Sequence, residues 1–268
     1  MEKPDDLSGI ADDSTPNVGR IYDFLLGGNH NFEIDRIYAE KIVETVPFTP
    51  KLARLVRWFL GVAARRLMQE GFTQFVDFAS GLPVQDHIHQ IAPEGSRVLY
   101  SDHDAVTVAY AKEIIGDNPD VAYVQCDVRH PEALLNSSLM EKIFDRTKKT
   151  AFGLNGITYF LSDEECEHTL KTLYDWADKG DKLYLCDSEW DEDKPSAKRI
   201  FELYSKIGQA TFSHSRKKMA TLSGRWKPAD PGYASLEEWI DISNTSISIK
   251  TEELSLVGGS MYGVILEK

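Results

Sequence analysis

The sequence contains few of the features that mark a secreted, metal-binding or membrane protein. Its three cysteines, Cys126, Cys166 and Cys186, form no CxxC pair and have no His/Cys spacing suited to zinc. No apolar run approaches the roughly 20 residues that span a bilayer. The first 15 residues are polar and acidic, without the basic-then-apolar order of a signal peptide. We therefore expect a cytoplasmic protein with reduced thiols, no bound metal and no membrane anchorage.

Basic residues are also scarce relative to acidic ones. The 268 residues include 30 Lys and Arg against 43 Asp and Glu, which gives a net charge of −13. Because nucleic-acid backbones are bound chiefly by Lys and Arg, this charge argues against a general nucleic-acid binder. It favours a small-molecule or protein substrate. The sequence contains no signal that we can interpret for the oligomeric state.

The N-terminal part of the chain reads as a tail followed by helices. Residues 1–15 lack periodicity, and we expect them to be disordered. Apolar residues recur at helical spacing over 18–26, and Gly27-Gly28 ends that helix. Further helices are predicted over 33–46 and from Pro50 to Gly71. We therefore predict a helical cap over residues 16–71.

From residue 72 the period of the pattern changes. Short apolar runs predict buried parallel strands at 74–78, 97–101, 121–125, 150–154 and 182–186. Helices are predicted between and after them, over 83–91, 104–116, 131–145, 162–178 and 195–208. This alternation is typical of a doubly wound, Rossmann-like α/β sheet. Alternating segments at 246–250 and 261–266 predict a C-terminal antiparallel strand pair, so that 72–268 forms one α/β domain.

In such a sheet, ligands bind beyond the carboxyl ends of the strands. The first strand ends at Asp77, and the small residues Ala79, Ser80 and Gly81 follow, which allow the backbone to approach a ligand closely. Pro83 suits the first turn of the next helix, whose free N–H groups would face an anionic part of the ligand. Taken alone, an ordinary strand-to-helix turn explains this segment equally well.

Polar residues also follow the next three strands. Asp102, beside His103, can accept hydrogen bonds from both hydroxyls of a ribose. Asp127 can accept one from the amino group of a purine, with Val128 packed on the ring, and Asn155 would lie near the reactive group. A single strand-end Asp is more often a cap or turn residue. Four polar strand ends in this order predict a ligand that contains adenosine.

The loop after the first strand discriminates between such ligands. A dinucleotide site needs G-x-G-x-x-G for its pyrophosphate, and this loop lacks that pattern, which argues against a nicotinamide-dependent oxidoreductase. S-adenosylmethionine (SAM) carries no phosphate and tolerates a loop with fewer glycines. A terminal antiparallel strand pair is also typical of methyltransferases.

Three segments carry a resemblance to a known family. The stretch RIYDFLLGGNHNF at 20–32 resembles the R-x-Y-D-x-x-L-G-G-x-x-N-F signature of a bacterial SAM-dependent methyltransferase family long catalogued as a domain of unknown function. FVDFASGLP at 75–83 and VLYSDHD at 98–104 are similar to its F-L-D-I-G-T-G-L-P and V-V-Y-V-D-N-D. The resemblance runs from about residue 16 to the end. Ala79 replaces the usual glycine, His103 the usual asparagine, and Asn155–Tyr159 differs from a His-rich family segment.

The resemblance implies methyl transfer from SAM to an acceptor, which leaves S-adenosylhomocysteine (SAH). The helical cap would close over the cofactor through Tyr22, Gly28 and Asn31, although core packing explains Tyr22 equally well. His30 and Tyr159 are the candidates for a catalytic base or an orienting group, and a lone loop histidine is often incidental. We expect a small-molecule acceptor. A catalytically silent SAM- or SAH-binding sensor stays open as the alternative.

Overall fold

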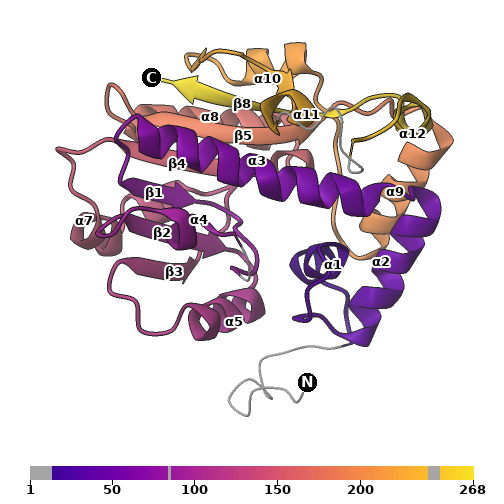
Figure 1. Ribbon diagram of the computed structural model, residues 1–268, viewed down its shortest axis with the longest axis horizontal. Helices are drawn as coiled ribbons and strands as arrows, with labels where there is room; N and C mark the ends of the chain where they lie inside the picture. The colour runs from indigo at the N-terminus through magenta and orange to yellow at the C-terminus, as the bar shows by residue number, and fades with distance from the viewer. Residues whose placement is uncertain (1–13, 84–85, 241–247) are drawn as a thin grey trace.

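The computed structural model describes residues 14–83, 86–240 and 248–268, and these residues contain one mixed sheet (Figure 1). The strand order is β3-β2-β1-β4-β5-β8-β6, with β7 also paired to β8. The parallel strands are β1 (Gln74–Asp77), β2 (Arg97–Asp102), β3 (Val121–Gln125), β4 (Thr150–Asn155) and β5 (Lys182–Ser188). The antiparallel strands are β6 (Lys227–Pro228), β7 (Ala234–Ser235) and β8 (Met261–Glu267). The predicted doubly wound sheet is confirmed.

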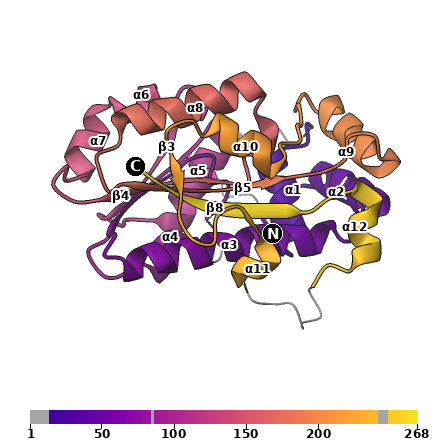
Figure 2. The ribbon, with the colours of Figure 1, turned by 90° about the horizontal axis from the view of Figure 1, so that it is seen from above.

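Helices cover both faces of this sheet (Figure 2). One face carries α3 (Thr49–Gln69), α4 (Ile88–Ile91), α5 (Ala105–Ile115) and α11 (Leu236–Ile240). The other carries α6 (Glu132–Leu135), α7 (Ser138–Ile143), α8 (Asp163–Trp176) and α10 (Arg216–Leu222). At one end of the sheet lie α1 (Val18–Leu25), α2 (Glu33–Thr45), α9 (Pro195–Lys206) and α12 (Thr251–Val257) (Figure 1). None of the helices in the described ranges is long and apolar enough to cross a membrane.

The alternation of side chains along the strands separates two halves of the core. Phe75 and Tyr100 pack with α3, whereas their neighbours Val76 and Leu99 pack with α8. The half that contains α3 also includes residues of α1 and α2, so these helices share a core with the sheet. The predicted boundary at residue 71 between a cap and the α/β domain stays a prediction.

Two buried contacts join α1 to α2. The Arg20 guanidinium lies 2.7 Å from the Asp35 carboxylate, and both side chains are buried. Asp35 also accepts hydrogen bonds from the backbone N–H groups of Asn17 (2.9 Å) and Phe32 (2.8 Å). The arginine that begins the N-terminal signature therefore joins the two helices through a buried ion pair.

Two predicted helices differ from those observed. The prediction of a helix over 83–91 that starts at Pro83 was wrong, since α4 begins at Ile88 after Asp86 (φ 54°) and the cap His87, whose N–H donates to Gln90. No helix N-terminus therefore follows the loop after β1 directly, although residues 84–85 lie outside the described residues. The helix predicted over 131–145 is divided into α6 and α7, because the Ser137 hydroxyl caps a new helix.

The C-terminal antiparallel pairing is present, with other partners than predicted. Residues 246–247 lie outside the described residues, and 248–250 contain no strand. Instead β8 pairs with β5 and with the short β6 and β7. Pro228 lacks an N–H, and an edge strand such as β6 tolerates that. Of the predicted tail, residues 1–13 lie outside the described part of the chain.

Candidate cofactor site

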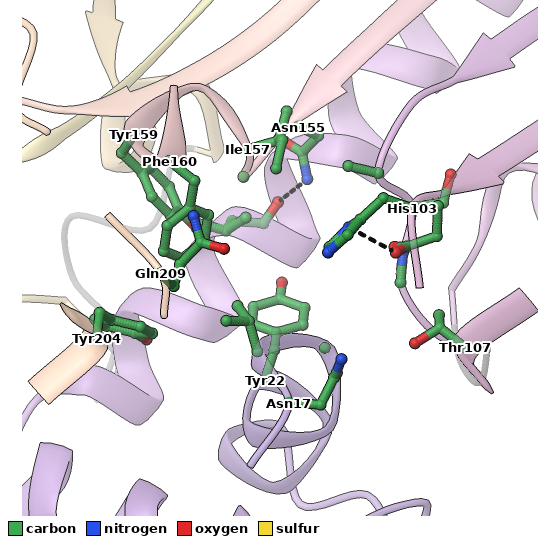
Figure 3. Close-up of a pocket in the computed structure, with 18 of the residues that line it drawn as sticks. Asn17, Tyr22, His103, Thr107, Asn155, Ile157, Tyr159, Phe160, Tyr204 and Gln209 are labelled. Carbon is green, nitrogen blue, oxygen red and sulfur yellow. Dashed lines mark hydrogen bonds and ion pairs between the residues drawn. The ribbon is translucent and has the colours of Figure 1, made fainter. Parts of the chain in front are cut away.

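A cavity of about 270 Å³ lies at the carboxyl ends of β1, β2 and β4, where the strand order reverses. Side chains of α1, α3 and the 3₁₀ turn Thr158–Phe160 close it from the other side (Figure 3). The predicted site residues that line it are Tyr22, Asp77, Ala79, Ser80, Gly81, Asp102, His103, Asn155 and Tyr159. The structure therefore brings most of the residues that were predicted from the strand ends together at one cavity.

The loop after β1 is held in a tight turn against β2. Ala79 (φ 50°) and Gly81 (φ 63°) both have left-handed backbone conformations. The Ser80 N–H donates to the Ser101 carbonyl (2.9 Å), and the Gly81 N–H donates to Asp102 (3.1 Å). These bonds bring the backbone of the loop to the wall of the cavity.

Asp102, at the end of β2, is the carboxylate best placed to bind hydroxyl groups. Besides Gly81, it accepts a hydrogen bond from the Asp104 N–H (3.0 Å), and His103 Nδ1 lies 3.3 Å from it (Figure 3). The hydrogen bond to Asp102 raises the pKa of His103 above its ordinary value. A carboxylate accepts more bonds than its two backbone donors supply, so Asp102 keeps acceptor capacity toward the cavity.

Asp77, at the end of β1, is buried beside a tyrosine that sequence reasoning missed. The Tyr184 hydroxyl donates to Asp77 (2.8 Å), and a Cβ at Gly153 would overlap both groups. Burial raises the pKa of Asp77, against the hydrogen bonds from Ser80 and Tyr184. The glycine in β4 thus makes room for a buried carboxylate.

Arg57, on α3, is a second group that the sequence analysis missed. Arg57 is 8% exposed, and it lines the cavity. Its Nη1 has no hydrogen-bond partner, and its guanidinium forms no ion pair, among the residues that the structure describes. The only available signal was its position within the apolar run Leu55-Val56 and Trp58-Phe59. The guanidinium carbon lies 5.6 Å from the centroid of the Tyr22 ring, but no carboxylate in the described ranges neutralises its charge. An anionic ligand group would therefore stabilise this buried cation.

Asn155 and Tyr22 connect the sheet and α1 to α3. Asn155 Nδ2 donates to the Val56 carbonyl (3.2 Å), and its buried Oδ1 has no partner in the described ranges (Figure 3). The Tyr22 hydroxyl donates to the Ala53 carbonyl (3.0 Å), and burial raises its pKa to about 12. Tyr22 therefore belongs both to the core and to the cavity wall.

Three predicted residues of the N-terminal signature lie away from this cavity. Gly28 and His30 line a separate hollow, which shares Arg57 with the first. The Asp23 carboxylate accepts hydrogen bonds from the His30 N–H and from Asn31 Nδ2, both 2.8 Å, and a Cβ at Gly28 would overlap it. In the structure these residues hold the loop between α1 and α2.

Asp127 and Val128, after β3, do not line the cavity either. The Arg129 guanidinium binds Asp127 at 2.6 Å and lowers the pKa of that carboxyl, against the effect of burial. Val128 packs in the core on the α8 side, and its carbonyl accepts from the Thr169 hydroxyl (3.0 Å). The acceptor capacity of Asp127 is thus directed to a neighbouring side chain.

The groups around the cavity fit a nucleoside that carries an amino acid. Asp102 has spare acceptor capacity, Arg57 is a buried cation without an ion pair in the described chain, and Asn155 has an unbonded oxygen. A parallel sheet that ends in an antiparallel strand, with these groups at the carboxyl ends of its strands, defines a class I methyltransferase.

The chain belongs to the S-adenosyl methyltransferase family, whose profile matches residues 5–262. It is similar to a candidate methyltransferase from Thermobifida fusca (25% identity, TM-score 0.84, covering 99% of this chain and 98% of that one). It is also similar to a duf574 family protein from Streptomyces avermitilis (22%, 0.86, 96% and 99%).

A more distant neighbour shares the fold alone. It is the SAH-bound magnesium protoporphyrin IX methyltransferase from Synechocystis (14% identity, TM-score 0.52, covering 92% and 91%). No protein of curated function matches the chain significantly in sequence. Because the chain belongs to the S-adenosyl methyltransferase family, the protein is a SAM-dependent methyltransferase, and SAM is its cofactor.

Proposed function

We propose that SAM binds in the cavity beyond β1, β2 and β4, and that the methyl acceptor is a small molecule. The observation that carries the proposal is the convergence of Asp102, Arg57 and Asn155 on one cavity, each with hydrogen-bonding capacity unused in the described chain. The net charge of −13 supports a small molecule over a nucleic acid. The three cysteines are free and buried, which supports a cytoplasmic location.

Each part of the cofactor has a group suited to it. Asp102 would accept the ribose hydroxyls, with the backbone of Ala79, Ser80 and Gly81 against the same region. Arg57 would bind the carboxylate of the methionine part, and Asp77 would bind its ammonium group. Both Arg57 and Asp77 are buried, so an opposite charge on the ligand would stabilise each of them.

The residues near the methyl group of the bound SAM would orient the acceptor and shield the methyl group. When bound, SAM supplies an electrophilic methyl group. Burial raises the pKa of Tyr159 well above its ordinary value, so Tyr159 stays protonated and would orient the acceptor by hydrogen bonding, not act as a base. His30 lines the other hollow, so we propose no catalytic role for it at the SAM site. We propose that Gly28, Asn31, Asp127 and Val128 maintain the fold.

Calorimetric titration of SAH into the protein tests this site with a matched pair of variants. Losing hydrogen bonds to a charged group, at about 1.5–3 kcal/mol, predicts that Asp102→Ala weakens SAH binding by roughly 10- to 100-fold. Asp127→Ala removes the same side chain one strand away, outside the cavity, and should change the affinity by less than about threefold. Equal effects of the two substitutions, with both variants folded by circular dichroism, would overturn the proposal.

A further inference from the structure

A second, smaller cavity of about 90 Å³ adjoins the cofactor cavity. The residues that line both cavities are Tyr22, Leu25, Val56, Tyr159, Phe160 and Tyr204. Figure 3 shows Tyr159, Phe160 and Tyr204 on one side of the cofactor cavity, opposite His103 and Thr107. A molecule in the second cavity would therefore lie on the side of the proposed SAM site opposite Asp102 and the ribose, and we place the acceptor there.

The lining of this second cavity is apolar, aromatic and uncharged. Among the described residues no Asp, Glu, Lys, Arg or His borders it. The residues that line this cavity alone are mostly large apolar ones: Leu52, Trp190, Ile200, Phe201, Phe212 and Met261. Burial raises the pKa of Tyr204, as of Tyr22, to about 12, so these phenols are neutral at physiological pH. A charged occupant would lose its hydration without gaining a partner.

The aromatic rings meet edge to face, which suits a planar occupant. Phe160 packs against Tyr159 with centroids 4.7 Å apart at 64°, and against Tyr204 at 5.4 Å and 66°. Such arrangements present both ring faces and ring edges, the two geometries in which another aromatic ring packs well. An apolar cavity of about 150 Å³ holds one benzene ring. The second cavity is smaller, at about 90 Å³, so an occupant places at most one ring in it, and a second ring would extend into the adjoining cofactor cavity.

Two buried polar atoms in this wall have no partner within the described residues. They are the indole Nε1 of Trp190 and the hydroxyl Oγ1 of Thr211. Trp190 is fixed in place, since its backbone N–H and carbonyl both bond the Ser213 hydroxyl (2.8 Å each) and its ring stacks on Phe201. An indole N–H can only donate, and buried donors are normally bonded, so it calls for an acceptor atom on the occupant.

From this arrangement, and resting on the proposed function, we infer that the methyl acceptor is a neutral, planar molecule of one or two aromatic rings. One of its oxygen atoms accepts a hydrogen bond from Trp190 Nε1, and Thr211 supplies a second polar contact. Neutral aliphatic chains and charged aromatics are the alternatives that the experiment separates.

The test measures binding to the SAH-loaded protein by ligand-observed NMR and calorimetry. The probes are three neutral bicyclic carbonyl compounds (coumarin, chromone and 1-tetralone), the anion coumarin-3-carboxylate and the aliphatic ketone 2-decanone. We expect at least one neutral bicycle to bind, and the anion and the aliphatic ketone to bind at least about tenfold more weakly. Loss of one neutral hydrogen bond predicts that Trp190→Phe weakens that binding by roughly 2- to 12-fold. Trp58→Phe, which alters the other hollow, should leave it unchanged.

The outcomes separate this inference from the cofactor site. If SAH binds but none of the bicycles does, or if the anion or 2-decanone binds equally well, the inferred acceptor class is wrong. Equal affinities of the wild type and Trp190→Phe would overturn the assigned hydrogen bond. Failure of SAH itself to bind would overturn the proposed cofactor site, and the acceptor inference with it.

Discussion

Ala79 has the backbone conformation of a glycine. With φ at 50°, an alanine pays about 1–2 kcal/mol relative to the right-handed regions. We therefore expect Ala79→Gly to leave the free energy of unfolding unchanged or to raise it by about 1 kcal/mol, as measured by urea denaturation. The matched control is Ala109→Gly, within α5, which should lose about 1 kcal/mol. Equal losses at the two positions would contradict a strained turn after β1.

His103 makes stability depend on pH in a predictable direction. Its hydrogen bond to Asp102 raises its pKa above 6.5, so the folded state favours the protonated ring. The resulting stabilisation is complete below the unfolded-state pKa and is lost as the pH rises through the folded-state pKa. Because the side chain is 60% exposed, solvent screening keeps the effect below about 1 kcal/mol.

The comparison with His103→Asn isolates this contribution. The urea midpoint of the wild type relative to the variant should be higher at about pH 6 than at about pH 8.5. A difference between the two proteins that stays constant, or that grows as the pH rises, would show that the His103–Asp102 contact does not have the charge assigned to it.

At the scale of elements, α3 lies close to the sheet because β8 has a glycine opposite it. A Cβ at Gly263 would overlap the ring of Phe59, which is completely buried. We expect Gly263→Ala to lower the free energy of unfolding by about 1–3 kcal/mol. In the double variant with Phe59→Leu, the loss should be smaller than the sum of the single losses. Additive losses would contradict a direct clash between β8 and α3.

The sequence predicted those elements whose boundaries are encoded locally. Asn17 and Ser162 cap α1 and α8 with their own side chains, and the buried parallel strands are apolar runs. The start of α4 depends instead on the positive φ of Asp86, which no pattern signals. The two-residue strands β6 and β7 exist only because β8 lies beside them, so they are too short for periodicity to detect.

At the scale of the molecule, topology explains which site residues could be predicted. Asp77, Asp102 and Asn155 end neighbouring parallel strands, and these ends necessarily meet at one edge of the sheet. Arg57 and Trp190 reach the cavities from α3 and from the segment after β5, through packing between distant parts of the chain. The apolar run around Arg57 indicates burial but not which cavity the side chain reaches, and no local pattern indicates the place of Trp190.

Hydrogen exchange with and without SAH, followed by mass spectrometry, tests the location of the cofactor site most directly. We predict that SAH slows exchange in the segments that line the cavity after β1, β2 and β4, namely 77–82, 101–105 and 155–160. The segment 127–131 after β3, which includes Asp127 and Val128, should be unaffected by SAH. Protection centred on 127–131 or on the loop 27–32, without protection at 77–82 and 101–105, would contradict it.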